Sequence, residues 1–96
     1  MKDYIGCSIL ANYFRGIEAV GGKITFDEDG FTFKSHKLNI QTGETKIEYS
    51  QIKKITTSNT LGIVPNGMSI VTKDDVKHKF VINNRKKVIE FISSKL

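Results

Sequence analysis

The C-terminal part of the chain constrains the fold most: it reads VKHKFVI over residues 76–82, NN over 83–84 and RKKVIEFISSKL over 85–96. The first segment alternates as a strand does, and the last has apolar residues at helical spacing. The residues predicted to face the core are Val76, Phe80 and Ile82 in the strand and Val88, Phe91, Ile92 and Leu96, with Ile89 beside them, in the helix. Asn83 or Asn84 would supply the side-chain oxygen that caps the helix. We therefore expect a final strand followed by one amphipathic helix.

An acidic turn in the first third of the chain gives the clearest hairpin signal. Asp27-Glu28-Asp29-Gly30 lies between residues 23–26 and 31–35, in which apolar and polar residues alternate. An Asp-Gly pair between alternating segments is typical of a β-hairpin. The core residues that this hairpin predicts are Ile24, Phe26, Phe31 and Phe33.

Two stretches that contain glycine or proline predict further turns. Gly21-Gly22 suits a turn or bulge that needs a positive φ angle, and Pro65-Asn66-Gly67 has the residues of a tight turn. Other strands are predicted over residues 9–14, 45–49, 52–57, 68–72 and 76–82, the last two pairing across 73–75. For residues 9–14, a helix also fits the spacing of the apolar side chains.

The remaining segments complete a strand-rich chain. Residues 36–43 predict a strand end and a polar turn, Ile47 and Tyr49 fall on one face of their strand, and Ser50-Gln51 bends the chain. The apolar stripe of the helix has to be buried, and the open end of a curled sheet offers an apolar surface. Residues 1–96 are therefore predicted to be a single, mainly β domain, a barrel or sandwich of about seven antiparallel strands capped by the C-terminal helix.

The positive charge of the chain is concentrated near its C-terminal end. The net charge is +5, and residues 73–96 hold seven cations and three anions, which leaves +1 for residues 1–72. Such an end would suit an acidic partner: a nucleic-acid backbone, an anionic lipid headgroup or an acidic protein surface. The alternative is a basic face that only contacts water.

The start of the predicted helix carries three consecutive cations, which oppose the helix dipole. A bound phosphate, carboxylate or headgroup would offset that repulsion, whereas long side chains could equally turn away into water. The candidate residues for binding an anion or a partner are Arg85, Lys86 and Lys87, together with Lys77 and Lys79 of the preceding strand.

An apolar loop precedes the Pro-Asn-Gly stretch. Leu61, Ile63 and Val64 would form a contact site for a partner or a membrane if they are exposed. They would be part of the core if the loop folds over the mouth of the barrel, and we prefer this second alternative.

The residue pattern argues against an enzyme. His36 and His78 have no cysteine or carboxylate at the spacing of a metal site or catalytic triad. Cys7 is the only cysteine, so no internal disulfide or thiol metal cluster is expected. The acidic turn at 27–30 lacks the spacing of an EF-hand. We expect no cofactor and no metal, and a protein kept in a reducing cytoplasm because no signal peptide or membrane span is apparent.

Three stretches of the chain resemble bacterial GRAM-domain proteins, which have the pleckstrin-homology-like fold. They read ANYFRGIEAVGGKITF over residues 11–26, NTLGIVPNG over 59–67 and KFVINNR over 79–85. The resemblance extends from about Leu10 to Leu96 and implies two roughly orthogonal antiparallel sheets with a helix over one end. It also implies a scaffold that binds lipids, peptides or proteins. Phosphoinositide-binding relatives use a basic loop between the first two strands, and residues 15–23 here have no such cluster, which argues against a headgroup site at this loop.

The sequence therefore predicts a non-enzymatic binding module, cytoplasmic or attached to a membrane surface, that contacts a protein partner or an anionic membrane lipid. Two alternatives stay open: a nucleic-acid-binding protein that uses the basic C-terminal end, and an oligomer-forming structural domain with no small ligand.

Overall fold

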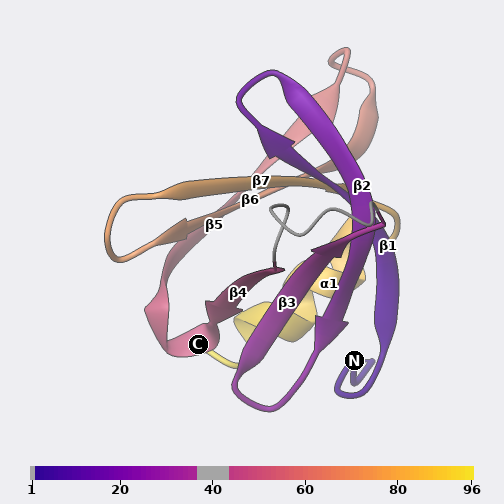
Figure 1. The fold of residues 1–96 in the computed structure, drawn as a ribbon. Coiled ribbons are helices and arrows are strands. Elements are labelled where there is room, and N and C mark those ends of the chain that lie inside the picture. Colours follow the sequence, from indigo (N-terminus) through magenta and orange to yellow (C-terminus); the bar gives the residue numbers. More distant parts are fainter. Residues whose placement is uncertain (1, 37–43) are drawn as a thin grey trace.

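A computed structural model describes residues 2–36 and 44–96 of the chain, and these residues form one curled antiparallel sheet and one helix (Figure 1). The elements are β1 (Ser8–Arg15), β2 (Glu18–Phe26), β3 (Gly30–Ser35), β4 (Glu44–Glu48), the 3₁₀ turn η1 (Tyr49–Gln51), β5 (Ile52–Thr60), β6 (Val64–Thr72), β7 (Lys77–Ile82) and α1 (Arg85–Ser93). The strand order is β4-β3-β2-β1-β7-β6-β5. The sheet curls into a half-barrel, and α1 covers one end, so the predicted fold class is confirmed.

The hairpin predicted around the acidic turn is present as β2 and β3. Ile24 pairs with Phe33 and Phe26 with Phe31, and all four side chains are buried as expected. Asp27 holds the turn, because its Oδ1 accepts the backbone N–H groups of Asp29 and Gly30 at 2.9 Å each. These bonds lower the pKa of the Asp27 carboxyl, and the bond from Asp29 has the largest effect. The nearby Lys46 ammonium lowers this pKa as well.

The helix fills the end of the half-barrel with three buried side chains, Val88, Phe91 and Ile92, as predicted. Phe91 meets the ring of Phe26 edge-on at a centroid distance of 5.6 Å, and Ile89 packs partly against the core. The prediction for Leu96 is wrong, since this residue lies beyond the helix and is 59% exposed. The helix ends at Ser93, and its buried side chains up to Ile92 cover the opening.

The cap of the helix also differs from the prediction. Asn84 is the N-cap residue, but its side chain makes no capping hydrogen bond, and its backbone is left-handed with φ of 55°. Asparagine tolerates this conformation better than most residues. Asn84 therefore redirects the chain from β7 into α1, which is a different role from the one we assigned to it.

Two predicted turns lie inside strands instead. Gly21 and Gly22 belong to β2, and neither has a positive φ angle. Gly22 is buried where β3 passes so closely that a Cβ atom would collide with the carbonyl oxygen of Lys34. The other predicted turn, residues 65–67, is part of β6, and the chain reverses earlier, at Leu61-Gly62, with φ angles of 53° and 71°.

The other strand predictions have mixed outcomes. Residues 9–14 form a strand and not a helix, and Ile47 and Tyr49 are buried as expected. Val76 precedes β7 and is exposed, so its placement on the core face is wrong. The turn predicted over 36–43 lies outside the described residues from position 37 onward.

Candidate binding surface: the β5–β6 tip and the start of the helix

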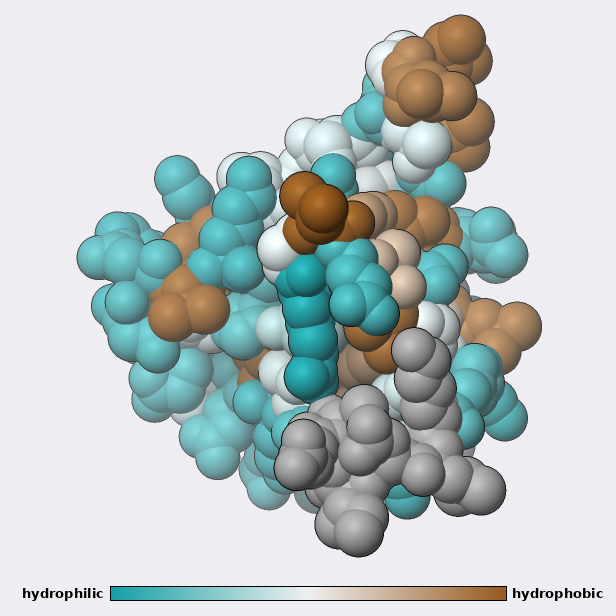
Figure 2. Space-filling model, turned by 45° about the horizontal axis from the view of Figure 1, so that its top comes forward, coloured by the Kyte–Doolittle hydropathy of each residue, from teal (hydrophilic) through white to brown (hydrophobic). Residues whose placement is uncertain are grey.

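The tip of the β5–β6 hairpin carries three of the exposed large apolar side chains among the described residues. Leu61 is 90% exposed, Ile63 79% and Val64 46%. The tip forms the brown projection at the upper right of Figure 2, well away from the sheet. Our preference for a loop folded over the mouth of the barrel is therefore wrong.

Two backbone N–H groups of this tip donate hydrogen bonds within the turn. Gly62 N–H donates to the carbonyl of Asn59 at 3.2 Å, and Ile63 N–H donates to that of Thr60 at 3.0 Å. Below the turn, the Thr60 hydroxyl donates to the side-chain oxygen of Asn66 at 2.6 Å. The tip thus presents aliphatic side chains while the amides of Gly62 and Ile63 are hydrogen-bonded.

Arg85 ties the start of α1 to the base of this hairpin. Its Nη1 donates to the carbonyl of Ser58 at 2.8 Å, to Oδ1 of Asn59 at 3.1 Å and to the carbonyl of Gly67 at 3.3 Å. Arg85 was one of the predicted anion-binding residues, but its Nη1 already donates to three protein oxygens. Its position indicates a structural contact more than a ligand contact.

The next two cations of the helix are exposed beside the hairpin base. Lys86 and Lys87 line an open hollow together with Lys2 and Glu90. The fold brings Lys2 to this place from the other end of the chain, and no local pattern in the sequence could have indicated it. The hollow therefore holds three cations and one anion.

The two predicted lysines of β7 lie apart from this group. Lys77 is exposed at the start of β7, and five residues separate it from Ile82, a rise of about 16 Å along the strand. The ammonium of Lys79 sits over the ring of Phe14 at 4.8 Å. The five predicted cations thus form no single cluster, and Lys86 and Lys87 lie together in the hollow that Lys2 and Glu90 also line.

A histidine–tyrosine pair lies in the partly buried interior of the curl. Nδ1 of His78 and the hydroxyl of Tyr13 are hydrogen-bonded at 2.8 Å, and the two rings stack at 6.0 Å. Burial lowers the pKa of His78, and the Asp74 carboxylate opposes that effect. No group of three His, Cys, Asp or Glu in the described residues could hold a metal ion.

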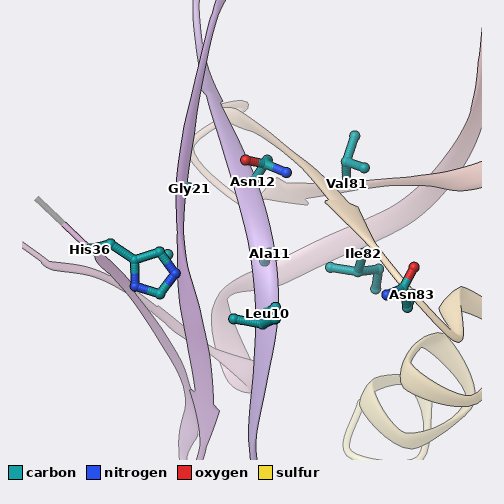
Figure 3. A pocket seen from close by; sticks show the side chains of 9 residues that line it. Leu10, Ala11, Asn12, Gly21, His36, Val81, Ile82 and Asn83 are labelled. Carbon is teal, nitrogen blue, oxygen red and sulfur yellow. The ribbon is translucent and has the colours of Figure 1, made fainter.

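A shallow hollow on β1, β2 and β7 is shown in Figure 3. Leu10 and Val81 form apolar walls, and Asn12, His36 and Asn83 supply polar groups around a volume of about 310 Å³. No Lys, Arg, Asp or Glu lines it. The hollow therefore has no Lys or Arg side chain that would attract the acidic partner suggested by the charge distribution.

Comparison with known proteins gives a fold but no family. No family model matches the chain, and no curated protein gives a significant match. The chain is similar in structure to the C-terminal domain of an unknown protein from Leishmania infantum, with a TM-score of 0.77 and 18% sequence identity. The match covers 92% of this chain and 79% of that one. At this identity the likeness supports the fold alone.

Proposed function

We propose that this chain is a non-enzymatic module that binds the surface of an anionic membrane. In this proposal the tip residues Leu61, Ile63 and Val64 enter the membrane interface, and Lys86 and Lys87 meet the headgroups. The observation that carries it is the exposure of three aliphatic side chains on a projecting hairpin tip, in a chain whose net charge is +5. The resemblance to GRAM-domain proteins supports the same class of function.

The length of the tip matches the depth of a membrane interface. Three residues separate Ser58, which Arg85 holds, from Leu61. At the rise of a strand this corresponds to about 10 Å. Interfacial segments reach about 5–10 Å into the boundary between headgroups and acyl chains. The apolar side chains would therefore be immersed while the helix start remains at the level of the headgroups.

The energies are sufficient for reversible attachment. Burying one Leu or Ile side chain stabilises a complex by about 1.5–3 kcal/mol, and each lysine near an anionic leaflet contributes about 1 kcal/mol. Association also costs translational and rotational entropy, which offsets part of this stabilisation. We therefore expect weak binding that depends on anionic lipid.

The composition of the tip favours a membrane over a nucleic acid. Residues 61–65 contain no aromatic side chain on which a base could stack and no charged side chain. No helix in the described part of the chain has the length and hydropathy that a membrane span needs.

Vesicle co-sedimentation tests the proposal. The protein should bind vesicles that contain phosphatidylserine and not vesicles of phosphatidylcholine alone, and Leu61→Ser/Ile63→Ser should lower the partition coefficient at least tenfold. Leu10→Ser is a matched control, because Leu10 is 64% exposed on β1, away from the tip. Equal binding to both vesicles, or none, contradicts the proposal. Binding to RNA or DNA that Lys86→Glu/Lys87→Glu abolishes and the tip variant does not affect would favour the nucleic-acid alternative.

A further inference from the structure

We infer that Arg85 is a positioning residue that holds the apolar tip in a fixed place relative to the start of α1. The inference rests on the proposed function. It assigns to Arg85 a contact within the protein, in place of the anion contact that the sequence suggested.

The hairpin is weakly held at the level where Arg85 touches it. The β5–β6 register is regular from Lys54↔Val71 to Ser58↔Gly67, shifts there, and continues only with Thr60↔Val64. The distal part of the hairpin therefore has one ladder pair between the irregularity and the turn. A two-stranded hairpin with so little pairing has little stability of its own in water.

Arg85 supplies the missing connections at this irregularity. Its three acceptors are Ser58, Asn59 and Gly67, which flank the register shift on both strands. Hydrogen bonds from a charged donor are stronger than those between neutral groups. One side chain thus fixes both strands at the point where the pairing between β5 and β6 is interrupted.

The local sequence fits this contact. At Gly67 a Cβ atom would collide with the hydroxyl and carbonyl oxygens of Ser58, so glycine lets the two strands approach closely beneath the guanidinium. All three bonds come from Nη1, which stands one covalent bond farther from the backbone than Nζ of lysine and is held in the plane of the guanidinium. Lysine at position 85 would keep the charge but could not reproduce the contact to both strands.

The consequence concerns the geometry of binding. Lys86 and Lys87 follow Arg85 directly in α1, so any element that Arg85 holds keeps a fixed place relative to them. The tip begins three residues beyond Ser58. A fixed base lets the tip meet a membrane without a further loss of conformational freedom.

A distance measurement tests the positioning itself. Spin labels at Ile63→Cys and Lys87→Cys, in a Cys7→Ser background, should give one narrow distance distribution. Arg85→Gln and Arg85→Lys should each broaden it at least twofold, and Lys54→Gln, an exposed cation on β5, should leave it unchanged. An unchanged distribution in Arg85→Gln overturns the inference.

Vesicle binding separates positioning from direct contact with an anion. With unlabelled protein and phosphatidylserine-containing vesicles, Arg85→Lys should lose at least fivefold in partition despite its retained charge, as should Arg85→Gln. Binding of Arg85→Lys at the wild-type level would instead identify Arg85 as a simple anion contact and overturn the inference. If the wild-type protein does not bind these vesicles, the proposed function is contradicted. The distance measurement then decides by itself whether Arg85 holds the tip.

Discussion

The adjacent glycines Gly21 and Gly22 allow a prediction in which one added methyl group has opposite effects at neighbouring positions. Both lie in β2 without a positive φ angle, so alanine can adopt the backbone at either one. A Cβ atom at Gly21 would have ordinary contacts, 3.4 Å from Oδ1 of Asn12 and 3.8 Å from Cδ2 of His36. We expect Gly21→Ala to be neutral or to stabilise the fold by up to about 1 kcal/mol, because alanine has less freedom in the unfolded chain.

At Gly22 the same methyl group has no room. A Cβ atom would lie 2.7 Å from Cζ of Phe33 and 2.9 Å from the carbonyl carbon of Lys34, and would overlap the carbonyl oxygen of Lys34. The obstacle is the backbone of β3, and it cannot rotate away as a flexible side chain could. Overpacking of a core costs about 1–3 kcal/mol, and we expect the upper part of that range for Gly22→Ala.

Urea denaturation followed by circular dichroism measures both variants. With a slope of about 1–2 kcal/mol per molar urea for a small domain, Gly22→Ala should lower the midpoint by about 1–2 M. Gly21→Ala should leave it unchanged or raise it. Equal midpoints for the two variants would refute the close approach of β2 and β3 at Gly22. A changed slope would indicate an effect on the denatured state instead of on packing.

Three further predictions follow from the core, the acidic turn and the partly buried His78. Phe91→Ala should destabilise the fold by about 3–5 kcal/mol because the side chain is buried among aromatic rings, whereas Leu96→Ala should change thermal stability by less than about 0.5 kcal/mol. Asp27→Ala should cost about 1 kcal/mol in urea denaturation, since two backbone N–H groups of the turn lose their acceptor, and an unchanged midpoint would contradict this role. The folded state lowers the pKa of His78 below 6.5, so the unfolded state binds more protons between the two values and stability should fall as the pH drops below about 6.5. His78→Gln should remove that slope in thermal melts at pH 5–7, and persistence of the slope would assign it to another group.

The sequence was most informative where the pattern is local. The hairpin around residues 27–30 is determined by an Asp-Gly turn between alternating segments, and both its strands and its four core residues could be predicted. The helical spacing of Val88, Phe91 and Ile92 likewise identified the face of α1 that is buried. These patterns are periodic, and burial imposes the same period on any sheet or helix that forms.

The glycine and proline signals were less reliable because they show which backbone conformations a position can adopt, and not which one it adopts in the fold. Gly22 is needed for the close approach of another strand, and the turn of the β5–β6 hairpin uses Leu61 and Gly62, ahead of the proline. A glycine fits equally a turn, a bulge or a tight contact. Only the position of the neighbouring strand distinguishes these uses.

The candidate site depended most on tertiary structure. The sequence identified Leu61, Ile63 and Val64 as an unusual apolar group and placed cations at the start of the helix, but their exposure and proximity were not readable from it. Arg85 lies 26 and 27 positions from Asn59 and Ser58 along the chain, and the contact exists because α1 returns across the sheet to the hairpin base. Periodicity therefore determined most of the buried side chains, and the long-range path of the chain alone decided which of the exposed ones lie together.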